Sequence, residues 1–476
     1  MKNSIEPFEI DSPLNMYEKN IIEQNEIQEE ITNDNIIFQD ESRSDKSDKK
    51  IQKAYCGIRG DSEKTCILNV AVSAIGGGCF SFPFIMYEGG ILVSLFIFIF
   101  VTFSVYYSID LLRSFVVETK YFSFALMTEK ILGPKWLRTY AFCSFIIYTS
   151  MEVSYLSSIY LYVKRMYNLS SALSNIPYYI ISILIEIIIC LYITKIPNMH
   201  FLSIISIFCF LLMLFSLIVV SIIVNAAGKV GPKFTKDNLF FPDLSQKSFF
   251  NIIFKISSYI MIYTYGYSYH STFPTLLGNL HTVNQSNTKK VHLISFGIIS
   301  VAYLLLTIFG FILSNKVPNE IFQEKKEDDF FNEDWATIKK PFQYCLIIFL
   351  LFLIPIRFIV LRDNYITLIG KRKVTFFKEL TIVGIFIFIC NILVFCIAEF
   401  DEHLAKVQIK NMAQAFGGIF GVIISFCLPV INYVSVNGKK KIKSIIGYII
   451  LGFYTLIGIL SSGHIIYQIF VRDDKE

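Results

Sequence analysis

The sequence predicts an all-α polytopic membrane protein with eleven transmembrane helices. Hydrophobic residues make up 54% of the 476 positions and charged residues only 17%, whereas a typical soluble domain is about 25% charged. Apolar runs long enough to cross a bilayer recur along the chain, because about 20 helical residues span the hydrocarbon core. These two observations predict a bundle of membrane-spanning helices.

A polar segment precedes the first apolar run. Its stretch IIEQNEIQEEITNDN carries net negative charge, and such a composition buries too little apolar surface to fold alone. The segment lacks the charged-then-apolar start of a cleaved signal peptide. We therefore expect a disordered cytosolic tail over residues 1–63, a transmembrane domain over 64–470 and a short carboxy-terminal tail over 471–476.

The eleven apolar spans are expected at residues 66–87, 91–113, 138–162, 177–195, 199–225, 248–275, 291–314, 340–362, 376–398, 408–434 and 444–468. Lysine and arginine next to membrane helices gather on the cytosolic side. With the amino terminus in the cytosol, the basic clusters GKRK (370–373) and GKKKIK (438–443) fall inside, and the acidic loop 323–334 falls outside. The carboxy terminus is then extracellular or lumenal.

The sequence contains no motif that indicates a cofactor or a macromolecular partner. The net charge of +5 is spread over loops, so nothing indicates nucleic-acid binding. The ten cysteines fall mostly in apolar spans without metal-ligand spacing and are typical of small packing residues. We expect no metal site and no other cofactor, with the lipid bilayer as the surroundings of a monomer.

The first span contains material that breaks a helix. Gly76, Gly77 and Gly78 lack the side chains that favour helix and permit backbone angles that unwind it. Pro83 follows, and a proline is tolerated in the first turn of a helix, where its missing N–H has no helical partner anyway. The spacing therefore predicts that the helix stops at the glycines and restarts near Cys79.

The sixth span repeats this pattern, because Gly266 is followed by Pro274. Spans one and six are the first members of two five-helix sets, and a duplicated set with an odd number of helices must be inserted upside down. We expect an inverted repeat, with residues 66–225 against 248–434 and an added eleventh helix at 444–468. Paired broken helices at matching places in two halves mark a transporter's binding site.

Unwound backbone at membrane depth exposes N–H and C=O groups, which is tolerated only where they line a cavity or are buried in protein. The start of a half-helix suits a carboxylate, and the carbonyl end of the preceding half-helix suits an ammonium. One amino acid zwitterion would satisfy both ends. Close helix packing is the alternative use of such glycines. The expected substrate-binding residues are Ile75, Gly76, Gly77, Gly78, Cys79, Tyr263, Tyr265, Gly266 and Tyr267.

Seven stretches within residues 64–468 form an ordered series: NVAVSAIGGGCFSFPFIMYEGG (69–90), YFSFALMTEKILGPKW (121–136), KIPNMHFLSIISIFCFLLMLFS (195–216), GYSYHSTFPTLL (266–277), YLLLTIFGFIL (303–313), IPIRFIVLRDN (354–364) and AFGGIFGVIISFCLPVINY (415–433). Together they resemble the amino acid/auxin permease family, the amino acid transporters of the APC superfamily. The resemblance implies the LeuT-type inverted repeat and movement of amino acids, often with protons or sodium. It also implies carboxylate binding near Gly76, Gly77 and Gly78.

Two buried groups are candidates for proton coupling. Glu152 lies in the middle of the third span, and a carboxyl group inside a membrane is a functional candidate, although a structural role fits as well. His270 lies beside the sixth-span break, where it could carry a proton or orient the backbone. Before the first break only Asn69 and Ser73 are polar, which favours a proton-coupled symporter over a sodium-coupled one.

Two other functions compete with a secondary amino acid transporter. A non-transporting amino acid sensor on the same fold would have the same binding site, and only flux separates the two. A membrane-embedded acyltransferase using His270 would need a second catalytic group, and the sequence shows none at membrane depth. We therefore expect that the protein is not an enzyme. The plasma membrane and a vacuolar or lysosome-like membrane both remain open.

Overall fold

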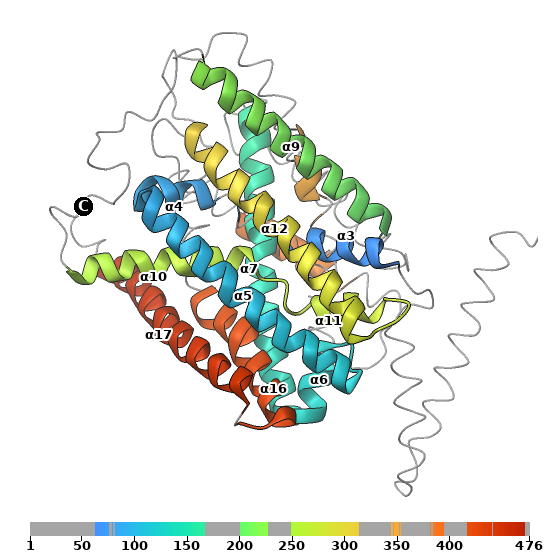
Figure 1. Cartoon of the computed structure of the whole chain (residues 1–476). Coiled ribbons are helices and arrows are strands. Elements are labelled where there is room, and N and C mark those ends of the chain that lie inside the picture. Colours follow the sequence, from blue (N-terminus) through green and yellow to red (C-terminus); the bar gives the residue numbers. More distant parts are fainter. Residues whose placement is uncertain are drawn as a thin grey trace, which may run out of the picture. The chain divides into compact units, whose positions relative to one another are not determined.

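The computed structural model describes residues 62–75, 79, 81–166, 200–226, 249–313, 344–345, 347–351, 353, 381, 384–394, 417–439 and 441–471. These residues all belong to one compact unit, Gly60–Glu476, and they are built from helices (Figure 1). The predicted amino-terminal tail, the span 177–195, the acidic loop 323–334 and the GKRK cluster lie outside them.

Five helices within this part are long and apolar enough to cross a membrane, namely Ile91–Thr119, Ser203–Ile222, Gln285–Ile312, Gly417–Asn437 and Ile442–Gly463. A shorter apolar helix covers Gly384–Val394. A multi-pass membrane protein agrees with these lengths, whereas the count of eleven spans rests partly on residues outside the described ones.

The first predicted span consists of two helices. The first half, α3 (Glu63–Ala74), begins at Ser62, whose hydroxyl accepts a hydrogen bond from the Thr65 N–H at 3.2 Å. The second half, α4 (Phe82–Gly89), carries Pro83 in its first turn. The predicted break is therefore present. Helical winding resumes as a 3₁₀ turn at Cys79 and Ser81, as predicted, and the α-helix itself begins at Phe82, with the proline in its first turn.

The sixth predicted span is divided in the same way. The helix α10 (Phe249–Gly266) ends at the glycine that the sequence singles out. A turn follows, and α11 (Phe273–Gly278) then carries Pro274 in its first turn. Both prolines thus begin second half-helices, as the sequence predicts.

The segment between spans two and three is more helical than expected. The helix α5 (Ile91–Thr119) continues past residue 113 and ends at Lys120, whose φ is 57°. A short helix, α6 (Phe124–Leu132), follows in the predicted loop, with the Ser123 hydroxyl accepting from the Leu126 N–H at 3.4 Å. The next helix, α7 (Pro134–Met166), also begins earlier than predicted. A left-handed residue ends α5 and a serine cap begins α6, so local capping sets these two boundaries.

The helix α12 (Gln285–Leu313) packs against both halves of the first broken helix, against α5 and against α9 (His200–Ala226). In Figure 1, α12 lies between α9 and α5. It also extends six residues before the predicted start of its span, residue 291. Since α12 contacts so many helices, it is well placed to carry residues that reach both breaks.

The carboxy-terminal helices begin with irregular winding. Two π-helical turns, η2 (Gly417–Gly421) and η3 (Ile423–Cys427), lead into α16 (Leu428–Asn437), and α17 (Ile442–Val471) closes the described part. A β-carbon on Gly418 would lie 2.6 Å from the Ser462 hydroxyl and 3.0 Å from the Gly458 carbonyl oxygen. The glycines thus allow η2 and α17 to approach closely.

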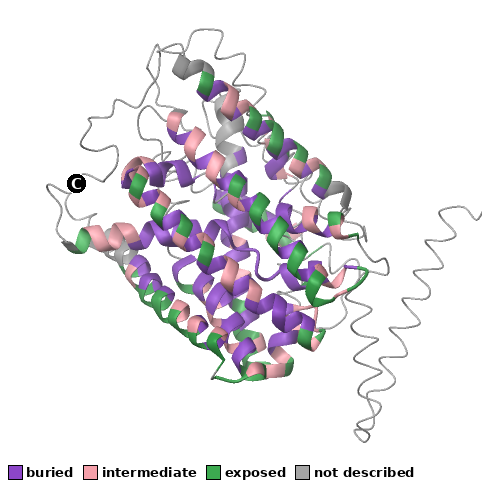
Figure 2. Ribbon diagram, in the orientation of Figure 1, coloured by how far each residue is buried: buried purple, intermediate pink, exposed green. Residues whose placement is uncertain are grey.

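Apolar side chains face outward along one side of α5. Phe96, Ile99 and Phe103 are 72%, 65% and 60% exposed, and their i, i+3, i+7 spacing places them on one helical face. Figure 2 shows exposed residues along the outer sides of the helices and buried residues between them. Such faces suit contact with lipid rather than water.

Candidate functional site

The two helix breaks meet at one hydroxyl group. Tyr303 on α12 lies with its Oη 2.8 Å from the carbonyl oxygen of Ala74 and 2.8 Å from that of Gly266. Ala74 is the last residue of α3, and Gly266 is the last residue of α10. The carbonyl ends of both first half-helices therefore converge on the same point.

Phe82 packs against the end of α10. A β-carbon on Gly266 would lie 2.9 Å from Cε1 of Phe82 and still closer to its Cζ. The Phe82 ring is fully buried, with its centroid 4.5 Å from that of Tyr263 and 5.2 Å from that of Tyr303. Gly266 is thus required by this close approach, and the first residue of α4 is held against the second break.

The three tyrosines predicted around the second break reach different helices. The Tyr265 hydroxyl lies 3.1 Å from that of Ser150 on α7. The Tyr267 hydroxyl lies 3.1 Å from that of Thr102 on α5 and donates to Ser300 on α12 at 3.4 Å. The Tyr263 ring faces Phe82. Their spacing of two therefore distributes them around the helix.

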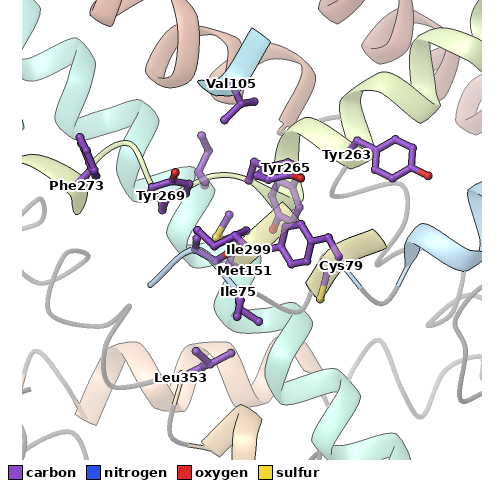
Figure 3. Packing of buried hydrophobic residues seen from close by; sticks show 14 of the residues in the cluster. Ile75, Cys79, Val105, Met151, Tyr263, Tyr265, Tyr269, Phe273, Ile299 and Leu353 are labelled. Atoms are coloured by element: carbon purple, nitrogen blue, oxygen red, sulfur yellow. Dashed lines mark hydrogen bonds between the residues drawn. The ribbon is translucent and has the colours of Figure 1, made fainter. Parts of the chain in front are cut away.

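The predicted residues of the first break are only partly described. Gly76, Gly77 and Gly78 lie outside the described residues. Ile75 and Cys79, on either side of them, are buried and belong to the same apolar cluster as Tyr263 and Tyr265 (Figure 3). The structure thus brings together the two flanks of the first break and the tyrosines of the second.

The start of α4 has no side-chain cap. Ser81 makes no capping hydrogen bond, in contrast to Ser62 at the start of α3. The first N–H groups of a helix have no partner within the helix and carry partial positive charge. The site thus combines two carbonyl ends, which attract a cation, with a helix start that attracts an anion.

Both proton-coupling candidates are buried, and one of them lies in the second break itself. Glu152 on α7 is 2% exposed; Ser150, which contacts Tyr265, is two residues away and therefore lies on a different face of the helix. His270 lies in the turn between α10 and α11 and is 1% exposed. Neither of its ring nitrogens has a hydrogen-bond partner among the described residues. An imidazole without partners is available for a proton or a ligand.

Charged residues join the helices at the two ends of the site. At the end where α3 begins, Glu63 pairs with Lys290 at 2.6 Å. At the end where α4 finishes, Glu88 pairs with Lys255 at 3.1 Å and accepts from the Tyr259 hydroxyl at 3.0 Å. The first pair joins α3 to α12, and the second joins α4 to α10.

A further charged cluster lies on α5. Asp110 pairs with Arg113 at 2.7 Å and with Lys443 of α17 at 2.9 Å, and Arg113 donates to Gln285 of α12 at 2.8 Å. Sequence reasoning missed this cluster, although charges near the end of an apolar run were its signal. Phe82 and Tyr303 both lie in stretches that carry the family resemblance, but the sequence does not show that they contact the two breaks.

Helices that stop and restart within an apolar bundle, with their free ends facing one another, are the architecture of transporter binding sites. The fold and the site define a membrane transporter. A family model described as "Transmembrane amino acid transporter protein" matches residues 59–471. The chain belongs to this family of transmembrane amino acid transporter proteins.

Solved structures of a manganese transporter from Eremococcus coleocola share the fold. The complex with an aromatic bis-isothiourea substituted compound aligns with a TM-score of 0.55 at 10% identity, covering 91% of this chain and 90% of that one. A mutant of the same manganese transporter, in which a histidine is replaced by alanine, aligns with a TM-score of 0.58 at 12% identity, covering 89% and 88%. The comparison with curated proteins gives no match.

Proposed function

We propose that this protein is a secondary active transporter of amino acids that binds the substrate zwitterion with the unwound backbone of its two broken helices. One observation carries the proposal: the carbonyl oxygens of Ala74 and Gly266 both lie 2.8 Å from a single hydroxyl group. Two helix ends that converge in a buried site attract a positive group without any acidic side chain. Membership of an amino acid transporter family supports the same substrate class.

The two charges of the substrate have separate partners in this proposal. The ammonium group lies at the carbonyl ends of α3 and α10, and the carboxylate lies at the uncapped start of α4. Backbone N–H groups at a helix start are suited to an anion. Gly76, Gly77 and Gly78 would let the backbone approach the carboxylate without side chains in between.

Alternating access follows from an inverted repeat of the LeuT type, in which two five-helix sets move around the central site. The matched division of α3/α4 and α10/α11, each with a proline in the first turn of the second half, supports this arrangement. We assign the Glu63 end to the cytosol because basic clusters gather there. The membrane is the plasma membrane or a vacuole-like membrane.

Protons are the proposed coupling ion, with Glu152 or His270 as the group that carries them. Both side chains are buried, and His270 lies in the turn of the second break, so a proton bound to it would respond to movement of the half-helices. His270 is the better placed of the two, because it lies in the turn between α10 and α11 itself.

The test is uptake of a panel of radiolabelled amino acids into proteoliposomes, with and without an imposed pH gradient. Gly266→Ala should abolish uptake, because the added methyl group meets the Phe82 ring at the second break. Gly297→Ala is the matched control, since a β-carbon there would meet nothing within 4 Å, and it should transport as the wild type does.

Two outcomes would contradict the proposal. Saturable amino acid binding without flux under any proton or sodium gradient would indicate a sensor. Accumulation of Mn²⁺ without amino acid uptake would place the chain functionally with the manganese transporter that shares its fold. Among the described residues, no three His, Cys, Asp or Glu side chains are grouped to hold a metal ion.

A further inference from the structure

The Tyr303 hydroxyl bonds the same two carbonyl oxygens that the proposed substrate's ammonium group would bind. Its side chain is fully buried, and its hydroxyl lies 2.8 Å from each of the two terminal carbonyl oxygens, those of Ala74 and Gly266. The ring is held edge-on by Phe82 and Tyr267, with centroids 5.2 and 4.9 Å away. Packing by these two rings therefore positions the hydroxyl between the carbonyls.

A hydroxyl group satisfies these carbonyls only in part. The last carbonyls of a helix have no partner within the helix and carry partial negative charge. Tyrosine has one O–H hydrogen, so it can donate fully to one carbonyl oxygen at a time. An ammonium group has three N–H donors, and the two carbonyl oxygens and the phenolic oxygen are three acceptors at the same point.

We propose that Tyr303 is a positioning residue that stands in for the substrate's ammonium group while the carrier is empty. When substrate binds, the ammonium takes over the carbonyls of Ala74 and Gly266, and the Tyr303 oxygen becomes its third acceptor. When substrate leaves, the Tyr303 O–H returns to the carbonyls and holds the ends of α3 and α10 together. This inference rests on the proposed function.

The role has a kinetic signature. Net uptake into empty vesicles requires the empty carrier to return across its conformational cycle, whereas exchange of external for internal substrate uses only the loaded carrier. A residue that serves the empty state alone should therefore affect net uptake and spare exchange. A residue needed only for folding would lower both by the same factor.

The experiment compares Tyr303→Phe with the wild type in proteoliposomes, using the amino acid that gives the highest uptake in the panel above. Without the phenolic O–H, the carbonyl ends of α3 and α10 lose the donor that holds them together while the empty carrier returns, so the barrier to that return rises and net uptake should fall about tenfold. Exchange against internal substrate should stay within about twofold of the wild type, because the ammonium supplies the missing donors.

Tyr107→Phe is the matched control. The Tyr107 hydroxyl also donates to a backbone carbonyl, that of Lys443 at 2.7 Å, but it joins α5 to α17 away from the breaks. Its removal should leave the ratio of exchange to net uptake unchanged. Equal loss of uptake and exchange in Tyr303→Phe, or no loss of either, would overturn the inference while leaving the proposed function intact.

Two further outcomes are decisive. A wild-type protein that neither accumulates nor exchanges any amino acid contradicts the proposed function and this inference with it. If Tyr303→Phe fails to fold, the wild type alone decides. Its exchange should exceed its net uptake by less than about tenfold, since the Tyr303 bridge lowers the barrier to return of the empty carrier, and a larger excess would contradict the role of Tyr303.

Discussion

Asp110 on α5 forms ion pairs with two cations, Arg113 one turn further along the helix and Lys443 on α17, and these two cations differ in burial. The Arg113 side chain is 5% exposed, whereas the Lys443 side chain that also pairs with Asp110 is 44% exposed. A buried charge that loses its partner is strongly destabilising, but an exposed one is hydrated by water. The two ion pairs of Asp110 should therefore contribute unequally.

Asp110→Ala should lower the free energy of unfolding by about 3 kcal/mol, because Arg113 then stays buried without its carboxylate. Lys443→Ala should lower it by less than about 1 kcal/mol. Denaturation in detergent, followed by intrinsic fluorescence, measures both variants. Equal effects of the two substitutions would show that Arg113 finds another partner or leaves the interior.

At the scale of single helices, α17 packs closely on η2 because Gly458 and Gly418 have no side chains where the two elements meet. A β-carbon on Gly458 would overlap the carbonyl oxygen of Gly418 and lie 3.2 Å from Cγ2 of Val422. Gly452, on the same helix, has nothing within 4 Å of such a β-carbon. Both positions are helical, so the pair separates crowding from helix propensity.

Gly458→Ala should destabilise the protein by about 1–3 kcal/mol, because α17 must move away from η2. Gly452→Ala should stabilise it by about 0.5–1 kcal/mol, since alanine favours helix and meets no obstacle there. Thermal denaturation in detergent tests both. A Gly458→Ala protein as stable as the wild type would mean that η2 and α17 lie further apart.

At the scale of the whole molecule, the two end pairs bracket the central site. Glu63–Lys290 closes one end, and Glu88–Lys255 closes the other. All four side chains are partly exposed, so each pair contributes at most about 1 kcal/mol. Such small contributions suit contacts that form and break in the alternating access proposed above.

Cys79, which is fully buried in the first break, can report which end opens. In a protein whose other cysteines are replaced, Lys255→Gln should speed the reaction of Cys79 with an impermeant thiol reagent about threefold to fivefold from the Glu88 end only. Glu63→Gln should do the same from the opposite end. Faster labelling from both ends in either variant would indicate loosened packing rather than opening of one side.

The breaks were predictable because glycine and proline act through local backbone geometry. Pro83 and Pro274 lie where the sequence places them, and α10 ends at Gly266. The partners of the breaks were not predictable, because a tyrosine that reaches two distant carbonyls looks like any of the 27 tyrosines in the chain. The helix α6 escaped notice because a serine cap, rather than hydropathy, begins it.

The length of α5 also indicates the hydrocarbon thickness of the bilayer that the protein fits. Its uncharged part, residues 91–109, measures about 28 Å at 1.5 Å per residue, close to a hydrocarbon thickness of about 30 Å. Asp110 and Arg113 then stand at the level of the lipid headgroups. A membrane only a few ångströms thicker would bring this cluster to the depth of the acyl chains, where Lys443, whose side chain is 44% exposed, would lose its hydration unless the lipid around α5 thinned.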